Sequence, residues 1–293
     1  MKKYMKNKKV LITGAYGLLG AVLSKNLKDQ GYNLFRHGKK INRAERFSLI
    51  DRKILFKNLR RINPSAIINL SALTNIEECE NNFFKALEIN TLCVENFSEY
   101  LKYKNQIRFI HISTDQVYHG KGPHNEDKVN PVNNYALTKY LGEQALNSKK
   151  TLILRTNFVG RSLIKDKVSL TDWFISSVKK KKKISLYSDI YFNPLEINFL
   201  SKLIIKIMKK KINGIFNIGS NGGMSKAKFL LKISKTLKLN SKKCKVVKVN
   251  FSKKTLRPKN MIMNCNKFEK KFCMKLPSIE DQIHKVCRSY ENQ

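Results

Sequence analysis

The chain lacks cysteine pairs at metal-ligand spacing and any apolar run long enough to cross a membrane. None of its 6 cysteines stands in a Cys-x-x-Cys pair or beside a histidine at ligand spacing. We therefore expect no metal site, and reduced thiols in a cytoplasmic protein. A membrane helix needs about 18 consecutive apolar residues, so we expect no membrane span. The basic start through Lys9 imitates a signal peptide, but glycines interrupt the apolar residues that follow.

Acidic residues are also scarce. Among 293 residues, 59 Lys and Arg face 21 Asp and Glu, which gives a formal net charge of +38. Such a charge suits a polyanion-binding surface or reflects compositional drift. The lysines are spread along the whole chain, and the one dense run, from Lys179 to Lys183, lacks interleaved aromatic residues. We therefore favour drift and expect no specific nucleic-acid partner, although a basic surface would attract an anionic substrate.

A glycine-rich stretch near the start carries the first functional signal. An apolar run from Val10 to Ile12 has strand length, and helical spacing begins near Ala21. Between them, the three glycines would allow a tight turn, a close approach of the backbone to a pyrophosphate, and close packing of helix on strand. The N–H groups that open the helix would hold the diphosphate. A glycine turn without a ligand remains the alternative. The predicted dinucleotide contacts here are Gly14, Tyr16, Gly17, Leu18, Leu19 and Gly20.

The next predicted strand, from Tyr32 to Phe35, bears on cofactor choice. An acidic residue after this strand would accept the ribose 2′-hydroxyl of NAD, but Arg36 follows instead. A guanidinium suits a 2′-phosphate, so we expect NADP(H), with NAD(H) as the alternative cofactor. Residues from Phe47 to Ile50 could form a short third strand, with Asp51 at its end near the adenine.

Further strand and helix patterns alternate along the chain. A buried strand is predicted at 66–70 and another at 107–112, each preceded by helical spacing. This alternation indicates an α/β fold with a Rossmann-type, doubly wound parallel sheet. Beyond residue 156 the pattern becomes irregular. We expect the NADP-binding domain to span 1–156 and about 192–219, and a smaller, discontinuous C-terminal substrate lobe to span about 157–191 and 220–293.

The candidate catalytic residues lie in the middle of the chain. Ser113 and Thr114 end a predicted strand, where ligands of such sheets bind. Tyr135 and Lys139 are four residues apart in a helical segment and so share a face. A nearby ammonium favours the phenolate and makes the tyrosine a usable proton donor.

These motifs resemble the extended short-chain dehydrogenases/reductases, and in detail their dTDP-4-dehydrorhamnose reductase branch. The resemblance spans nearly the whole chain. It includes the glycine turn, the segment 68–80, the region from Ser113 through Tyr135 to Glu143, the strand exit at 154–158, and Arg257-Pro258. Gln116 stands where the rhamnose enzymes usually carry a tyrosine, and Phe158 where many carry tryptophan. The reductase chemistry is intact, whereas the identity of the sugar stays open.

The resemblance implies an NADPH-dependent reductase of a 4-keto-6-deoxy nucleotide sugar in deoxysugar and surface-polysaccharide biosynthesis, acting as a homodimer. An epimerase of the same fold and a redox-inert regulatory subunit remain alternatives. Thr114, Tyr135 and Lys139 would be catalytic. The further cofactor contacts would be Leu70, Ser71, Ala72, Thr74, Asn90 and Ser113. The substrate contacts would be Thr114, Gln116, Asn157, Phe158, Trp173 and Arg257.

Overall fold

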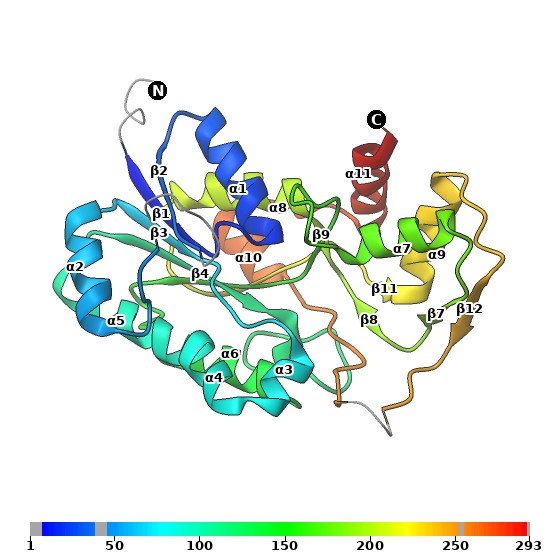
Figure 1. The fold of residues 1–293 in the computed structure, drawn as a ribbon, viewed down its shortest axis with the longest axis horizontal. Coiled ribbons are helices and arrows are strands. Elements are labelled where there is room, and N and C mark those ends of the chain that lie inside the picture. Colours follow the sequence, from blue (N-terminus) through cyan, green and yellow to red (C-terminus); the bar gives the residue numbers. More distant parts are fainter. Residues whose placement is uncertain (1–7, 39–45, 252–254, 292–293) are drawn as a thin grey trace. The chain divides into compact units, whose positions relative to one another are not determined.

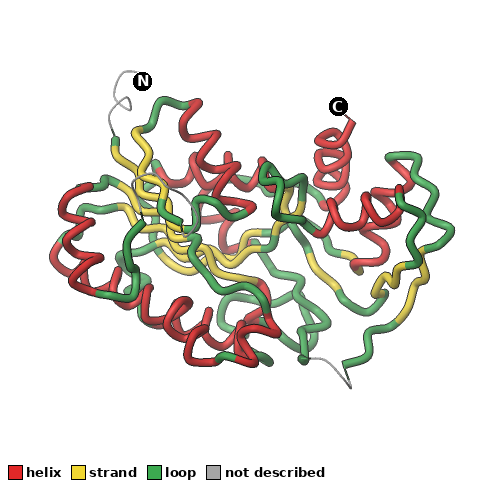
Figure 2. Tube along the Cα trace, in the orientation of Figure 1, coloured by secondary structure: helices red, strands yellow, loops and turns green. Residues whose placement is uncertain are grey.

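The structure is a computed structural model that describes residues 8–38, 46–251 and 255–291. Strands and helices alternate along the first two thirds of the chain (Figures 1 and 2). In chain order the elements are β1 (Lys9–Thr13), α1 (Leu18–Asp29), β2 (Asn33–Arg36), α2 (Arg52–Ile62), β3 (Ala66–Asn69), α3 (Ile76–Asn81), α4 (Phe83–Leu87), η2 (Glu88–Leu92), α5 (Cys93–Tyr103), β4 (Arg108–Thr114), η3 (Asp115–Val117), α6 (Asn134–Gln144), β5 (Leu152–Thr156), β6 (Phe158–Val159), α7 (Leu170–Lys179), β7 (Ile184–Tyr187), β8 (Tyr191–Phe192), β9 (Leu195–Glu196), α8 (Ile197–Met208), β10 (Gly214–Ile218), β11 (Met224–Ser225), α9 (Lys226–Thr236), β12 (Cys244–Val247), α10 (Asn266–Phe272) and α11 (Ile279–Glu291).

The central sheet confirms the predicted α/β fold. Its strand order is β10-β5-β4-β3-β1-β2, and β1 pairs in parallel with both β2 and β3. Leu11 of β1 lies opposite Phe35 on one side and Ile67 on the other. The chain therefore starts in the interior of the sheet and adds strands outward in both directions, as a doubly wound sheet does.

Helices cover both faces of this sheet. On one face, α2 and α5 pack against Leu11, Ile67 and Phe109, all fully buried. On the other side, α1 lies beside α8, and the amide of Asn26 donates to the hydroxyl of Ser201 at 2.9 Å (Figure 1). Both faces of the sheet are thus apolar and covered, which explains the continuous apolar runs of its strands.

The predicted third strand at Phe47–Ile50 is wrong. Its hydroxyl-bearing residue, Ser48, accepts hydrogen bonds from the backbone N–H groups of Ile50 at 3.2 Å and Asp51 at 2.9 Å. This local turn bends the chain into α2, where Asp51 is the N-cap. A serine that satisfies neighbouring backbone donors competes with strand pairing.

The chain divides into two compact units. The first contains the described parts of 1–114, 133–154 and 201–215, and the second those of 115–132, 155–200 and 216–293. The loop 115–132, predicted from the sequence to belong to the cofactor domain, therefore clusters with the second unit. The assignment of cofactor to the first unit and substrate to the second stays a prediction.

The second unit has a core of its own, built from α7, α9 and α11 and including Phe174, Phe229 and Val286. Two-stranded pairs, β11–β8, β12–β7 and β6–β9, surround this core. None of the three pairs is long enough to be stable alone. The helices must therefore fix these short strands in place.

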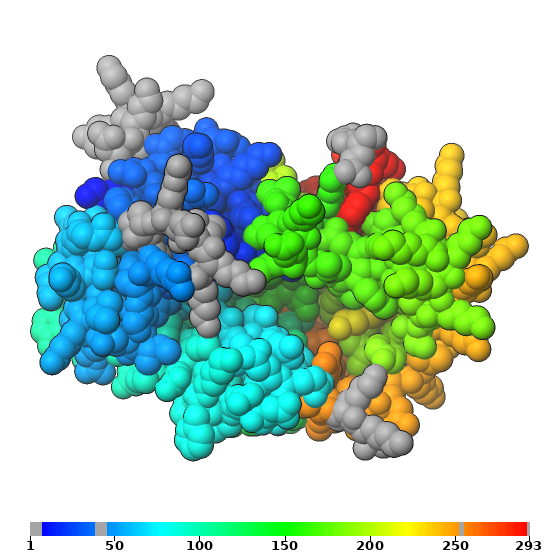
Figure 3. All heavy atoms as spheres, viewed as in Figure 1, coloured from blue at the N-terminus to red at the C-terminus, as the bar shows by residue number. Residues whose placement is uncertain are grey.

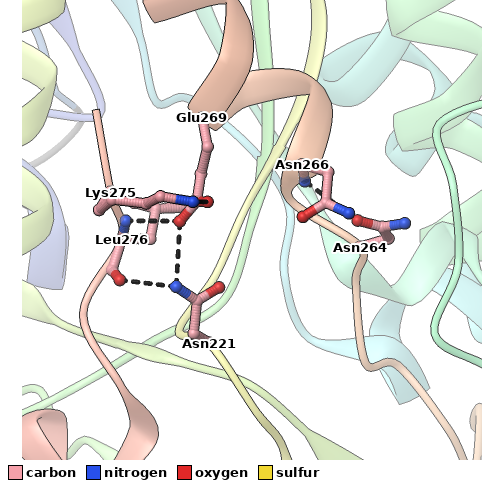
Figure 4. Close-up of polar contacts among 6 residues, drawn as sticks. All are labelled: Asn221, Asn264, Asn266, Glu269, Lys275 and Leu276. Atoms are coloured by element: carbon pink, nitrogen blue, oxygen red, sulfur yellow. Dashed lines mark hydrogen bonds and ion pairs between the residues drawn. The ribbon is translucent and has the colours of Figure 1, made fainter. Parts of the chain in front are cut away.

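A buried carboxylate on α10 ties the later loops of the second unit together (Figure 4). Glu269 accepts the N–H of Leu276 at 2.7 Å and the amide of Asn221 at 3.0 Å, and pairs with Lys275 at 2.9 Å. Burial opposes its charge, yet these donors outweigh burial and hold the pKa of Glu269 below its ordinary value. The carboxylate thus fixes the segment that leads into α11.

Candidate functional site

The turn between β1 and α1 and the first turn of α1 each require a glycine. Gly14 has a φ of +64°, and a Cβ there would lie 2.8 Å from the carbonyl carbon and oxygen of Leu70. A Cβ on Gly20 would lie 2.2 Å from the carbonyl oxygen of Gly14. The N-cap of α1 is Gly17, whose lack of a side chain leaves the first turn without a side-chain cap. These features fit a diphosphate held by backbone N–H groups.

The end of β2 places a cation beside this turn. The Arg36 guanidinium lies 5.6 Å from the centre of the Tyr16 ring, a cation–π distance. The same ring packs closely on Gly38, where a Cβ would lie 2.4 Å from Tyr16 Cδ2. Arg36 is exposed, so its guanidinium is available to an anion. Lys39 and Lys40, the next two residues of the sequence, lie outside the described residues.

Asp51, a predicted adenine contact, serves as a helix cap. Its carboxylate accepts the N–H of Ile54 at 2.9 Å at the start of α2. Ser48 binds its backbone N–H. The side chain is exposed, so capping explains its position without a cofactor.

The exit of β3 is tied to the end of β1. The Thr13 hydroxyl donates to the carboxamide oxygen of Asn69 and accepts the N–H groups of Leu70 at 3.2 Å and Ser71 at 3.3 Å. Leu70, Ser71 and Ala72 are half-buried. Two of these predicted cofactor contacts, Leu70 and Ser71, lie next to Gly14, and Ala72 follows them. A fourth, Thr74, is exposed two residues further along.

Asn90, another predicted cofactor contact, lies on the π-helical turn η2 and is fully buried. Its carboxamide oxygen accepts the N–H of Leu73 at 2.8 Å. Its amide donates to the Leu73 carbonyl at 3.1 Å and to the Thr138 hydroxyl at 3.0 Å. Its polar atoms therefore bind protein, and Asn90 holds the β3 exit against α6.

Lys139 is a buried charged group of the first unit, with 2% of its surface exposed. Its ammonium donates to the carbonyl of Ile112 at 2.9 Å and lies 3.3 Å from His111 Nε2. On the far side of that ring, Nδ1 lies 3.0 Å from the amide of Asn69. A buried chain of polar groups therefore runs from Lys139 through β4 and β3 to Thr13 on β1.

Burial changes the ionisation of this chain. It lowers the pKa of Lys139 to about 8, although the Glu143 carboxylate opposes the change. Burial and the charge of Lys139 together hold the pKa of His111 well below its ordinary value, so the imidazole is neutral. Glu143 itself is buried and accepts the Ser113 hydroxyl. Lys139 therefore carries its charge up to about pH 8.

Thr114 and Tyr135 lie at the same end of the sheet. Lys139 bonds to Ile112 and Glu143 to Ser113, and these contacts dock α6 on β4 directly before Thr114. Tyr135 is one turn before Lys139, is 7% exposed and packs against a small apolar cluster. The first unit thus places Thr114 at the end of β4 and Tyr135 and Lys139 on the helix that docks there. That the hydroxyl, the phenol and the ammonium act together on a developing alkoxide stays a prediction.

Apart from Thr114, which ends β4 in the first unit, the predicted substrate contacts lie in the second unit. The amide of Asn157 donates to the Asp115 carboxylate at 2.6 Å. Lys226, at the start of α9, interacts electrostatically with the same carboxylate. Burial lowers its pKa, the charge of Asp115 raises it, and that of Arg257 lowers it. Asn157, Asp115, Lys226 and Arg257 therefore form one cluster, here called the Asp115 cluster.

The other predicted substrate contacts lie elsewhere on the second unit. Gln116 is on η3, directly after Asp115. Phe158 pairs with Leu195 between β6 and β9. Trp173 is on α7 with 39% of its surface exposed. The structure therefore spreads these three residues over η3, β6 and α7, and their common role in substrate binding stays a prediction.

Sequence reasoning missed His111, Asn69, Glu143 and Lys226 as site residues. Two of them carry a readable signal, because His111 and Asn69 are polar residues inside otherwise apolar buried strands, and both are fully buried. A buried polar side chain must find a partner, so such residues mark a network. Glu143 is four residues after Lys139 on α6, a spacing that also predicts contact.

Membrane helices and metal clusters are both missing from the described part of the chain. No helix within it is long and apolar enough to cross a membrane. No group of three or more His, Cys, Asp or Glu in the described ranges could hold a metal ion.

Comparison with known proteins finds one matching family and several similar proteins. The sequence profile of the family described as "RmlD substrate binding domain" matches residues 8–292. The chain is 27% identical over 265 residues to the spore coat polysaccharide biosynthesis protein SpsK of Bacillus subtilis, covering 87% of this chain and 89% of the relative. It is 24% identical to a dTDP-4-dehydrorhamnose reductase of Sinorhizobium fredii, covering 82% of this chain and 85% of that protein.

Two further likenesses bear on fold and function. The chain is 24% identical to methionine adenosyltransferase 2 subunit beta of Xenopus laevis, covering 90% of this chain and 82% of that protein. A crystal structure of a dTDP-4-dehydrorhamnose reductase from Bacillus anthracis in complex with NADP superposes with a TM-score of 0.86, at 24% identity, covering 96% of this chain and 98% of that one.

Proposed function

Because the chain belongs to the RmlD substrate binding domain family, we propose that it is an NADPH-dependent reductase of a 4-keto-6-deoxy nucleotide sugar. The observation that carries the proposal is the docking of α6 on β4, with Lys139 bonded to Ile112 and Glu143 to Ser113. This packing sets Tyr135 and Thr114 at the carboxyl end of the sheet. The relatives named for polysaccharide and deoxysugar biosynthesis support the same role.

The residues of the first unit fit a bound NADPH. The N–H groups at the start of α1 would hold its diphosphate, and Arg36 its 2′-phosphate. The turn after β3, at Leu70 and Ser71, would lie along the dinucleotide, and the Lys139 ammonium would bind the nicotinamide ribose. NADPH supplies a hydride when bound. The absence of an acid after β2 favours NADP(H) over NAD(H).

The chemical step needs a proton and a hydrogen-bond donor at the carbonyl oxygen. Tyr135 donates its phenolic proton to that oxygen as the carbonyl carbon is reduced to an alcohol. The Thr114 hydroxyl donates a hydrogen bond to the same oxygen. The Lys139 ammonium stabilises the tyrosinate that remains, which then takes up a proton from solvent. One hydride and one proton convert the ketone to the alcohol.

The Asp115 cluster is the proposed site of the substrate's diphosphate. Arg257 is exposed, and Lys226 is half-buried within range of its charge. Two cations held near each other repel, and an anion between them removes the repulsion. The Asp115 carboxylate, held by Asn157, offsets part of the positive charge when the site is empty.

The alternatives differ in what they need from these residues. A redox-inert regulatory subunit would have no need of Thr114, Tyr135 and Lys139, yet all three are present. The likeness to methionine adenosyltransferase 2 subunit beta is the observation that favours that alternative. A dehydratase of this fold usually pairs an aspartate with a glutamate, where this chain has Gln116. An epimerase differs by returning the hydride to its intermediate, so product analysis separates it from a reductase.

We also propose a homodimer that acts in the cytoplasm. Phe84 on α4 has 79% of its surface exposed, and Leu137 on α6 has 36%. The segment with α3 and α4 forms a broad part of the surface, cyan in Figure 3. Large apolar side chains that are exposed in one chain can be buried in an interface between two copies. Phe84→Asp should shift the mass measured by light scattering from dimer to monomer, whereas Lys85→Asp should not.

The deciding experiment is a panel of dTDP-, UDP- and GDP-linked 4-keto-6-deoxy sugars incubated with NADPH, with the loss of NADPH absorbance followed over time. Turnover of one of them, with an alcohol as product, supports the reductase. Tyr135→Phe is the control for the chemical step. A chain that binds NADPH tightly and reduces none of the sugars would instead support the regulatory subunit.

A further inference from the structure

The buried chain of polar groups behind Lys139 has one consistent pattern of hydrogen bonds. It begins at Asn69, whose carboxamide oxygen accepts the Thr13 hydroxyl and the N–H of Ser71 at 3.3 Å. If the carboxamide were reversed, its NH₂ group would face that N–H, donor against donor. Its oxygen therefore points to Ser71, and its NH₂ group points to His111 Nδ1 at 3.0 Å.

This fixes the form of the imidazole. Because His111 Nδ1 accepts a hydrogen bond from Asn69, it carries no proton. The ring is fully buried and neutral, so its one proton is on Nε2. That N–H points at Lys139 Nζ, 3.3 Å away. An amine nitrogen can accept this hydrogen bond through its lone pair, whereas an ammonium, which has only donors, cannot.

We propose that His111 is a positioning residue that favours the uncharged amine of Lys139 until the cofactor is bound. The proposal rests on the proposed function, since it gives Lys139 the nicotinamide ribose as ligand. The hydroxyls of that ribose can accept hydrogen bonds from an ammonium, whereas the imidazole N–H offers the ammonium no acceptor. Above the pKa of Lys139, where the amine prevails, binding of NADPH therefore draws a proton onto Nζ, and cofactor affinity falls as the pH rises.

The other groups around Lys139 act differently. On its own helix, Glu143 favours the ammonium by its charge, but its carboxylate is bonded to Ser113. Cys93 on α5 is buried and its pKa is raised to about 12, so the thiol is neutral. Tyr135, one turn earlier, carries the phenolic proton that the proposed reaction requires. Among these groups, His111 is the one that presents an N–H to the amine.

The test uses two variants, each of which replaces one of the two nitrogens of the imidazole with a carboxamide. His111→Gln puts a carboxamide near the position of Nε2, where its oxygen can accept from an ammonium. His111→Asn keeps a partner for Asn69 near the position of Nδ1 and removes the group that faces Lys139. Lys139→Met and the double variant His111→Gln/Lys139→Met complete a cycle that isolates the coupling between the two residues.

The first readout is the melting temperature from about pH 7 to pH 10, without cofactor or substrate. As the pH rises, the melting temperature of the wild type should rise relative to that of Lys139→Met. The reason is that the folded state favours the uncharged amine of Lys139, whereas the unfolded state keeps the ammonium. In His111→Gln, more than half of that rise should disappear. The double variant should follow Lys139→Met. An equal rise in wild type and His111→Gln would overturn the proposal, and if the Gln variant does not fold, an equal rise in His111→Asn overturns it instead.

The second readout is the dissociation constant of NADPH over the same pH range, by fluorescence titration. The wild-type constant should rise by about tenfold per pH unit above the pKa of Lys139, as one linked proton requires. In His111→Gln this rise should begin about one unit higher. A rise that begins at the same pH in both proteins contradicts the proposal. If the wild type does not bind NADPH, the proposed function fails, while the melting experiment still decides the role of His111.

Discussion

Two lysines of this protein show how differently a fold can treat a cation. Lys139 in the first unit is 2% exposed and bonded to the Ile112 carbonyl, and it faces the neutral His111. Lys226 in the second unit is half-buried, and charges of both signs surround it, from Asp115 and Arg257. The first is held in one position by burial and by its hydrogen bonds. The second is placed where a ligand's charge can change its surroundings.

The contrast extends to how each site is encoded. Lys139 and Tyr135 are four residues apart on one helix, so local geometry alone places them on the same face. In the Asp115 cluster, even the directly bonded pair, Asp115 and Asn157, is separated by 42 residues. Only the folded second unit assembles that cluster. Mutations can therefore test whether the first site performs the chemistry and the second binds the substrate.

The largest effect should come from Tyr135→Phe, which keeps the ring in its apolar cluster and removes the proton. The rate of carbonyl reduction should fall by roughly 10²–10⁴-fold, the usual contribution of a positioned acid. The affinity for NADPH should barely change. Tyr140→Phe, on the same helix, is the matched control and should keep the wild-type rate. Full activity of Tyr135→Phe would show that the proton comes from elsewhere.

Lys139→Met should lower the rate and weaken NADPH binding together, and it should also change how stability depends on pH. The pKa of Lys139 is about 8 in the folded chain and returns to its ordinary value of 10.5 on unfolding. Between these values the unfolded state binds more protons, so the free energy of unfolding should rise with pH, by about 3 kcal/mol in total.

Urea unfolding of the wild type and Lys139→Met across this pH range measures that rise. Lys25→Met, on the exposed face of α1, should behave like the wild type. Parallel pH profiles for the wild type and Lys139→Met would mean that Lys139 keeps its ordinary ionisation in the folded chain.

Arg36→Ala should reduce the preference for NADPH over NADH by roughly 1.5–3 kcal/mol, the loss of a charged hydrogen bond. The measurement is a titration with both cofactors, and Lys25→Ala controls for the loss of one positive charge on the same unit. Equal affinities of the unmutated protein for NADPH and NADH would refute the assignment of Arg36 to the 2′-phosphate.

The smallest effect should come from the Asp115 cluster. Lys226→Met should raise the KM for the nucleotide sugar by about tenfold, or about 1.4 kcal/mol, with little change in kcat or in NADPH affinity. Lys228→Met removes an exposed charge from the same helix and should leave the KM unchanged. A drop in kcat without a change in KM would move Lys226 from substrate binding to the chemistry.

Much of the first unit follows from the sequence. The glycine spacing, the apolar strands and the Tyr135–Lys139 pair are local patterns, and the sheet order and α6 agree with them. The predicted strand at 47–50 failed because Ser48 satisfies backbone donors two and three residues further along. Such a side-chain bond is invisible to a pattern of apolar residues.

By itself, the sequence determined the strand–helix alternation that predicts the doubly wound sheet, the glycine turn and the spacing of phenol and ammonium, because each is a pattern of residues close together in the chain. The tertiary structure alone decided the state of Lys139. Three strands and a helix, which only folding brings into contact, bury Lys139 and supply its partners. They provide the Ile112 carbonyl that accepts its hydrogen bond and the His111 ring whose orientation Asn69 fixes. Ionisation responds to desolvation and to the direction of every neighbouring hydrogen bond, and neither exists until those elements pack.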